Sequence, residues 1–179
     1  MKHLRPTLLP LALLLSLAAC DKEEDKDKEP SKTDLLTANA WKDGEETLQL
    51  NGNTGRRTPS AASTNTYQFG RDGKLTITAP DGTTSTASWA FAGNETQLTI
   101  TRNGGSNTFD MVELSNNRLA YGFRYNQAQV QQALSGGANA QLLTLLLLSA
   151  GYYTFPAGTP SIPTPQLTSV HWTTTAVPK

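Results

Sequence analysis

Residues 67–123 decide the fold, because six short runs of alternating apolar and polar residues follow one another there. The runs are Tyr67-Gln68-Phe69, Leu75-Thr76-Ile77-Thr78-Ala79, Ala87-Ser88-Trp89-Ala90-Phe91, Leu98-Thr99-Ile100, Phe109-Asp110-Met111-Val112-Glu113-Leu114 and Leu119-Ala120-Tyr121-Gly122-Phe123. Such alternation places every second side chain on one face of a β-strand. The stretch therefore predicts a series of half-buried strands.

Turn-forming residues separate these runs. They are Asp72-Gly73, Asp81-Gly82, Gly93-Asn94, Asn103-Gly104 and Asn116-Asn117. Glycine and asparagine accept the positive φ angles of tight hairpins, and aspartate hydrogen-bonds the backbone of a turn. Short strands joined by such turns are typical of an antiparallel meander.

Seven strands are predicted before residue 126, and one further strand would complete a barrel. The seven ranges are 41–50, 64–69, 74–79, 85–91, 97–101, 107–114 and 118–125, with a polar loop expected over 51–64. The last strand comes from 151–155 or from 167–174. A barrel of eight strands is either just filled by its own side chains or just wide enough for one small ligand. An open sheet curled over a solid core is the alternative.

Composition limits the classes of function. The chain has 179 residues, enough for one domain, and its 15 Lys and Arg balance its 15 Asp and Glu. A nucleic-acid-binding protein would carry a basic stripe, so no such partner is expected. A single cysteine excludes internal disulfides and a cysteine-built metal cluster.

The N-terminus has the pattern of an export signal. Lys2 and Arg5 precede an apolar run over 8–19, which is too short to span a bilayer as a stable helix. The run ends in Leu17-Ala18-Ala19-Cys20, which resembles the lipobox of bacterial lipoproteins. The resemblance implies that residues 1–19 are removed and that Cys20 is acylated, for example with palmitate. An ordinary secretory signal followed by a chance cysteine is the alternative.

Residues 20–33 form a charged tether after this cysteine. Six acidic residues and four lysines with no apolar residue between 21 and 32 favour a solvated, extended segment. This run resembles the surface-export signal of Bacteroidota lipoproteins, which implies an outer-membrane location with display on the outer face. A plain spacer between lipid and domain is the simpler interpretation.

The domain is expected over 34–179, and roughly residues 34–123 of it resemble the lipocalin-like domain of small bacterial lipoproteins. The resemblance rests on Leu35-Leu36 before Trp41, on Tyr67-x-Phe69-x-x-Asp72-Gly73, and on Ala87-Ser88-Trp89. Asn39-Ala40-Trp41 stands where lipocalins carry Gly-x-Trp, and asparagine tolerates a left-handed backbone almost as glycine does. The family implies an up-and-down barrel that holds a small apolar molecule, with no cofactor and no catalytic residue.

A helical insertion is predicted over 126–150. Asn126 caps a first helix that Gly136 ends, and Asn139 caps a second helix that Gly151 ends. The leucine-rich run 142–148 could instead form a strand. As a helix it would pack on the barrel or form part of a lid. A proline-rich connection over 156–165 follows.

The sequence contains few candidate catalytic residues. His171 is the only histidine left after signal cleavage, so neither a catalytic triad nor a histidine-based metal site has enough members. Asp110 and Glu113 are expected on opposite faces of one strand, which prevents them from acting as a pair. We expect no enzymatic activity and no metal.

Aromatic residues on two strands are the candidates for ligand binding. They are Trp89, Phe91, Tyr121, Phe123 and Tyr125. They either line a cavity for a small hydrophobic ligand or fill the core. The sequence thus predicts a lipid-anchored envelope protein that binds such a ligand; the alternative is an accessory lipoprotein that contacts another envelope protein.

Overall fold

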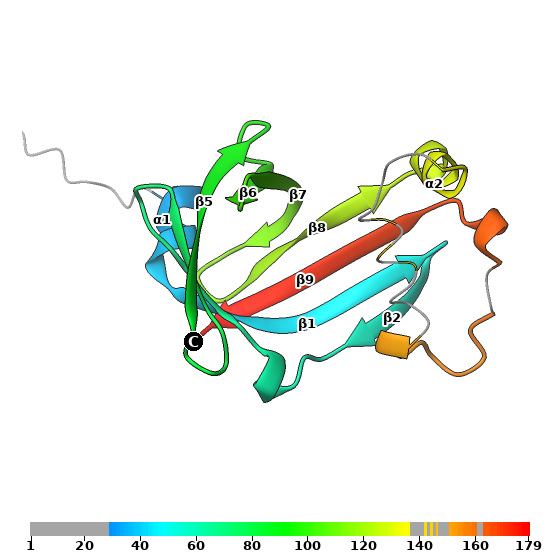
Figure 1. Ribbon diagram of the computed structural model, residues 1–179, viewed down its shortest axis with the longest axis horizontal. Coiled ribbons are helices and arrows are strands. Elements are labelled where there is room, and N and C mark those ends of the chain that lie inside the picture. Colours follow the sequence, from blue (N-terminus) through cyan, green and yellow to red (C-terminus); the bar gives the residue numbers. More distant parts are fainter. Residues whose placement is uncertain (1–28, 137–141, 143, 145, 147–150, 161–162) are drawn as a thin grey trace, which may run out of the picture.

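Antiparallel strands form one nine-stranded sheet in the computed structural model, which describes residues 29–136, 142, 144, 146, 151–160 and 163–179 (Figure 1). The strands are β1 (Ala40–Leu50), β2 (Asn53–Arg57), β3 (Thr66–Phe69), β4 (Lys74–Thr78), β5 (Thr84–Ala92), β6 (Gln97–Arg102), β7 (Gly105–Leu114), β8 (Leu119–Tyr125) and β9 (Val170–Pro178). From β3 to β9 each strand pairs with the next, β3 also pairs with β1, and β9 pairs back with β1. The predicted antiparallel meander that closes into a small barrel is therefore confirmed, with β9 as its last strand.

The strand β2 lies outside this ring, because among the described strands it pairs with β1 only. The first part of β1 pairs with β3, up to Lys42↔Thr66. Its second part pairs with β2, from Glu46↔Arg57 onward. The prediction of a polar loop over 51–64 is thus wrong for β2. The pair Asn51-Gly52 has φ angles of 47° and 88°, as a two-residue hairpin requires.

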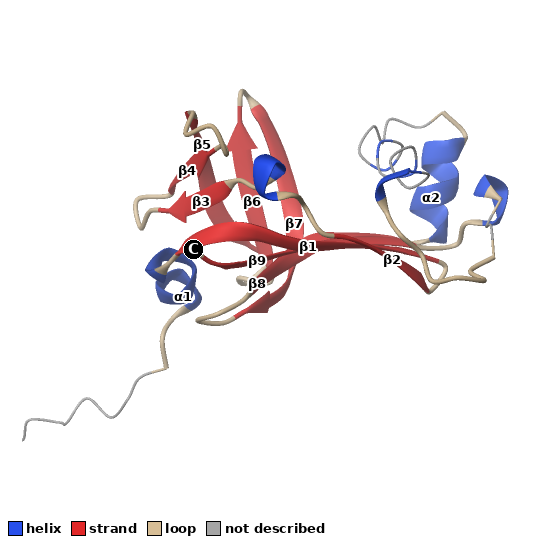
Figure 2. Cartoon of the chain, turned by 90° about the horizontal axis from the view of Figure 1, so that it is seen from below, coloured by secondary structure: helices blue, strands red, loops and turns tan. Residues whose placement is uncertain are grey.

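A four-stranded extension projects from the barrel. It consists of β2 and of residues 46–50 of β1, 123–125 of β8 and 170–174 of β9, and we call it the extension sheet. In Figures 1 and 2 these strands run away from the barrel toward α2, whereas α1 lies at the opposite end of the molecule.

Two hydrophobic cores correspond to these two parts. The barrel core contains the buried residues Leu36, Trp41, Phe69, Leu75, Trp89, Leu98, Leu119, Tyr121 and Ala176. The extension core contains Leu48, Tyr125, Val130, Ala133, Leu142, Tyr153, Leu167 and Val170. The second core exists because the segment after β8 packs its apolar side chains against the extension sheet.

Two irregularities in pairing keep apolar side chains on the core-facing side of the sheet. In β1 the register shifts between Asp43 and Glu46, so that both Trp41 and Leu48 are buried. In β7 it shifts between Met111 and Glu113, which leaves Val112 exposed. One extra residue in a strand reverses which face the following side chains occupy.

The helix α1 (Lys32–Ala38) covers one end of the barrel. Its first turn has a capping box in which Ser31 and Asp34 each bond the backbone of the other. Leu36 is fully buried in the barrel core, and its carbonyl oxygen accepts a hydrogen bond of 2.8 Å from the indole N–H of Trp41. The short helical turn predicted around residues 35 and 36 is confirmed.

The helix α2 (Gln127–Leu134) confirms the first predicted helix of the insertion. Asn126 accepts a hydrogen bond from the amide of Gln129, whose side chain bonds back to Asn126. Val130 and Ala133 face the extension core. The buried apolar side chains of this helix therefore lie on the face toward the extension sheet.

The second predicted helix of the insertion lies mostly outside the described residues. Leu142, Thr144 and Leu146 are helical, and Leu142 is fully buried. Gly151, the predicted end of this helix, and Tyr152 are also helical. The alternative strand at 151–155 contributes only an isolated bridge between Thr154 and Arg56. A short 3-10 helix (Thr164–Gln166) follows in the proline-rich connection.

Candidate functional site

The barrel wall opens between β7 and β8. The ladder between these strands runs from Leu114↔Leu119 to Asp110↔Gly122 and stops there. Beyond this point β7 continues beside β6, while β8 continues beside β9 as far as Tyr125. A groove of about 360 Å³ lies at this divergence.

Gly122 stands where the two strands separate. A Cβ atom at this position would lie 1.8 Å from the carbonyl oxygen of Trp172 in β9. No side chain tolerates such a contact, so only glycine lets the backbones of β8 and β9 approach this closely. This tight approach coincides with the point where β8 follows β9 away from β7.

The groove is lined mainly by polar residues. Its lining consists of Gln97, Ser106, Asn107, Thr108, Asp110, Gly122, Phe123, Arg124 and Tyr125. The Gln97 amide donates a hydrogen bond of 3.2 Å to the Asp110 carboxylate. Arg124 is exposed, and within the described residues it takes part in no ion pair. Within the part of the chain that the structure describes, the groove therefore presents an unpaired cation beside hydrogen-bonding groups.

The five predicted ligand-binding residues divide between the two cores. Trp89, Phe91 and Tyr121 belong to the barrel core, whereas Phe123 and Tyr125 belong to the extension core and line the groove. The structure therefore brings two of the five to the groove.

Inside the barrel, the predicted aromatic residues pack against neighbouring side chains. The indole N–H of Trp89 donates to the carbonyl oxygen of Gly70 at 3.0 Å, and its ring meets Phe69 and Phe91 edge-on at 5.7 Å and 5.4 Å. Burial, together with neighbouring acidic groups, raises the pKa of Tyr121 far above its usual value. This side chain is therefore neutral and inaccessible.

An aromatic row connects the barrel core with the groove; it comprises Phe109, Tyr121, Phe123, Tyr125 and Trp172. Phe109 lies 5.1 Å from Tyr121 and 4.6 Å from Phe123 between ring centroids. Phe123 stacks on Trp172 at 5.7 Å and on Tyr125 at 6.2 Å. Phe109, Phe123 and Trp172 remain partly exposed. The row offers an apolar surface with accessible ring faces or edges.

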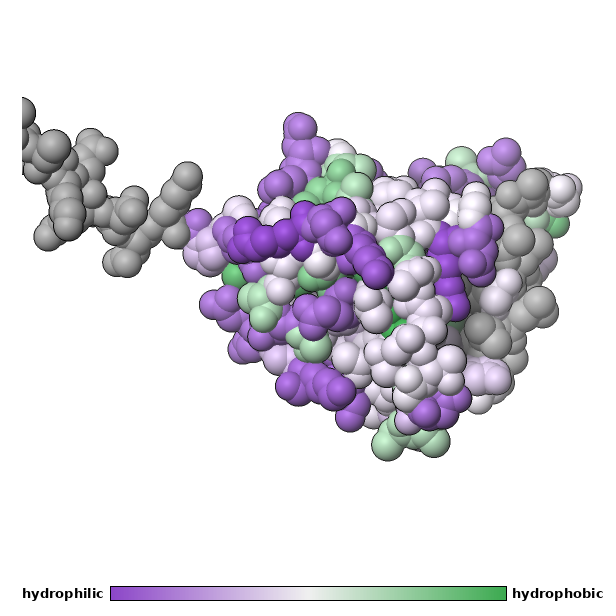
Figure 3. Space-filling view, turned by 60° about the vertical axis from the view of Figure 1, so that its left-hand side comes forward, coloured by the Kyte–Doolittle hydropathy of each residue, from purple (hydrophilic) through white to green (hydrophobic). Residues whose placement is uncertain are grey.

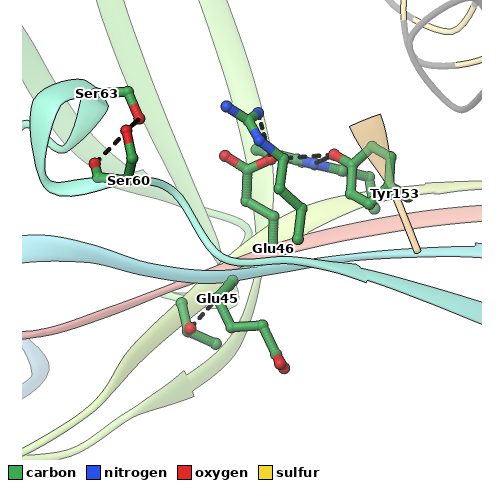
Figure 4. Close-up of polar contacts among 8 residues, drawn as sticks. Glu45, Glu46, Ser60, Ser63 and Tyr153 are labelled. Carbon is green, nitrogen blue, oxygen red and sulfur yellow. Dashed lines mark hydrogen bonds and ion pairs between the residues drawn. The ribbon is translucent and has the colours of Figure 1, made fainter. Parts of the chain in front are cut away.

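A polar network holds Trp172 in place, and the sequence did not predict it. The indole N–H of Trp172 donates to the Tyr153 hydroxyl at 2.9 Å, and this hydroxyl donates to Glu46 at 3.1 Å. Arg57 of β2 forms an ion pair with the same carboxylate at 3.2 Å. Figure 4 shows Glu46 and Glu45 on opposite faces of β1, with Glu46 turned toward Tyr153.

The spacing of apolar residues in the predicted strand 41–50 contained a signal for this network that the strand prediction did not use. Trp41 and Leu48 cannot both face inward in an unbroken strand, so a bulge had to lie between them. Placing that bulge after Asp43 turns Glu46 inward with Leu48. The contacts of Tyr153 depend on the path of the insertion, for which the sequence pattern gave no signal.

No described group of three or more His, Cys, Asp or Glu side chains is arranged to hold a metal ion.

The prediction that Asp110 and Glu113 face opposite sides of β7 is wrong, because the bulge at Val112 lies between them. They pair with Gly122 and Ala120, which lie two residues apart on β8 and thus share a face. Glu113 forms an ion pair with Arg118 at 2.8 Å, while Asp110 bonds Gln97.

The predicted lipidation site, Cys20, lies outside the described residues, as does most of the tether. None of the helices in the described part of the chain has the length and apolar content needed to cross a membrane. On the face drawn in Figure 3, hydrophobic residues form small separate patches among polar ones. The large apolar side chains exposed among the described residues are Val112, Tyr152 and Val177.

Comparison with protein-family models and with curated proteins finds no match for this chain.

Proposed function

We propose that this chain is a lipid-anchored, non-enzymatic protein of the bacterial envelope that binds a small hydrophobic ligand. The lipobox at Cys20 and the lipocalin-like pattern of the strands support this proposal from the sequence. The aromatic row supports it from the structure, because three of its rings stay partly exposed and one of these three, Phe123, lines the groove.

The aromatic row is the observation on which the proposal depends. Phe109, Phe123 and Trp172 contact one another through Phe123. A ligand lying on these rings would bury apolar surface at about 25 cal/mol per Å². The hydroxyl of Tyr153, already bonded to Trp172, would fix the indole beneath it. The ligand would therefore bind on the aromatic row rather than among the packed side chains of the barrel core.

Fluorescence of the mature protein tests this site. The probe is 1-anilinonaphthalene-8-sulfonate, and its binding is followed by the rise in the dye's own fluorescence in an apolar site. Phe123→Leu and Trp172→Leu should weaken dye binding about fivefold or more. Tyr152→Leu, at a side chain 56% exposed outside the row, is the matched control. Unchanged affinity in both row variants would refute the proposed site.

Lipid anchoring needs a separate experiment. Cells expressing the full chain are fed an alkyne analogue of palmitate, and membranes are then separated from soluble fractions. We expect label and membrane retention in the wild type and neither in Cys20→Ser, because Cys20 would carry all the acyl chains that hold the protein on the membrane. Retention of Cys20→Ser in the outer membrane would contradict the proposal.

An accessory role without a small ligand is the second candidate, and the packed barrel core favours it. Native mass spectrometry of the protein purified from its own host separates the two candidates. A co-purifying lipid-like mass supports ligand binding. A stable protein partner without such a mass supports the accessory role.

A further inference from the structure

We infer that the groove between β7 and β8 is a docking site for an extended peptide segment of a partner protein, which adds a strand to the open edges and places a carboxylate against Arg124. This inference is independent of the hydrophobic ligand, since it uses backbone groups and charge rather than the aromatic row.

The edge of β7 offers backbone hydrogen bonds to the groove. The amide of Met111 donates to Thr96 on the β6 side of the strand, at 2.8 Å. Backbone groups of successive residues in a strand point to alternate sides. The backbone N–H and C=O groups of Asp110, Thr108 and Ser106 therefore point toward the groove. Asp110 has Gly122 opposite it, but the ladder does not continue to Thr108 or Ser106.

The edge of β8 borders the groove on the side opposite β7. Gly122 faces Asp110 across the last pair of the ladder, and Arg124 lies two residues further on. Arg124 therefore points its backbone groups the same way. Among the described residues, no hydrogen bond joins Arg124 to Thr108 or Ser106. Two open edges thus flank one groove.

The open edge of β7 lacks the protection that exposed strands usually carry. Residues 105–108 of β7 are exposed and include neither a charged residue nor a proline. Native proteins commonly guard such edges with charge, proline or a covering element, because an open edge recruits other strands. An unguarded edge beside a groove is the geometry that strand addition uses.

Charge selects the kind of peptide. Arg124 is free of ion pairs within the described residues, whereas Asp110 is hydrogen-bonded to Gln97. The polar lining disfavours a uniformly apolar segment. The open part of β7, residues 105–109, is roughly 17 Å long at about 3.3 Å per residue. The structure therefore assigns to the groove a segment of about five residues with an acidic side chain near its centre.

Isotope-labelled mature protein and a defined peptide test the inference. The peptide alternates threonine and valine with glutamate at its third position and has blocked ends. We expect its addition to shift the amide resonances of Ser106, Thr108 and Arg124 and to slow their hydrogen exchange. The same peptide with methylated backbone nitrogens should not bind, because it lacks the donors.

A charge exchange provides the second arm. Arg124→Glu should weaken binding of the glutamate peptide about two- to fivefold, as expected for the loss of one exposed ion pair. It should strengthen binding of the same peptide with lysine in place of the glutamate. Arg102→Glu, at an exposed arginine that does not line the groove, is the matched control. The inference fails if the shifts fall on Phe123 and Trp172 alone, if the methylated peptide binds equally well, or if neither peptide responds to Arg124→Glu.

Discussion

Trp172 and Tyr153 are joined by a hydrogen bond of 2.9 Å from the indole N–H to the phenolic oxygen, although the two residues belong to different parts of the chain. Trp172 lies in β9, whereas Tyr153 lies in the segment that returns from the insertion. The Tyr153 hydroxyl also donates to Glu46 of β1. One hydroxyl thus fastens the returning segment to two strands of the extension sheet.

Tyr153→Phe should lower the free energy of unfolding by about 1–2 kcal/mol, because the Trp172 N–H and the Glu46 carboxylate each lose a partner in a partly buried site. Urea denaturation followed by circular dichroism measures the change. Tyr152→Phe is the matched control, since Tyr152 is mainly exposed and its ring, which Arg57 contacts at 5.1 Å, is kept. Equal stability of the two variants would show that the network contributes nothing.

Alkaline pH should weaken the same network. Burial and the nearby Glu46 raise the pKa of Tyr153 from 10.0 to about 12. Because the folded-state pKa is the higher one, the stabilising contribution is complete below pH 10 and is lost as pH rises toward 12. The difference in unfolding free energy between the wild type and Tyr153→Phe should therefore shrink over this range. A constant difference from pH 9 to pH 12 would contradict the assignment.

Gly122→Ala should destabilise the protein by about 3 kcal/mol, because its methyl group would meet the backbone of Trp172 rather than a flexible side chain. For a domain of this size we expect a fall in Tm of roughly 6–12 °C. Gly105→Ala is the control, since the nearest atom to its added methyl group is 3.7 Å away and its φ is not positive. A thermal melt of Gly122→Ala that matches this control would refute the close approach of β8 and β9.

Leu36→Ala should lower the free energy of unfolding by about 2–5 kcal/mol, because this fully buried side chain joins α1 to the barrel core. Leu35→Ala in the same helix, at a half-buried position, should cost clearly less. Guanidinium unfolding of both variants measures the contrast. Equal losses would mean that α1 does not close the barrel through Leu36.

The sequence predicted the barrel because its signals are local. Alternation from Tyr67 to Phe123 fixes which side chains face inward, and Gly or Asn at the turns fixes where each strand ends. The helix cap at Asn126 was likewise readable, since a capping residue acts on an amide three positions away.

The groove was not predicted because it depends on contacts between distant segments. In the sequence alone, Gly122 is a glycine that destabilises a strand, and only its contact with the Trp172 backbone explains why glycine is required there. The hairpin at Asn51-Gly52 carried a clear local signal, but the polar residues after it suggested a loop. The aromatic candidates were correctly placed on inner faces, yet alternation alone cannot say which of two cores each one joins.

The strand β1 begins beside α1 with Trp41 in the barrel core and ends with Leu48 in the extension core. β8 spans the two cores in the same way, with Tyr121 in one and Tyr125 in the other. Neither core can be lost without releasing half of a strand that the other core holds. Heating should therefore produce a single cooperative transition in calorimetry, and deletion of the insertion should lower the melting temperature of the barrel as well.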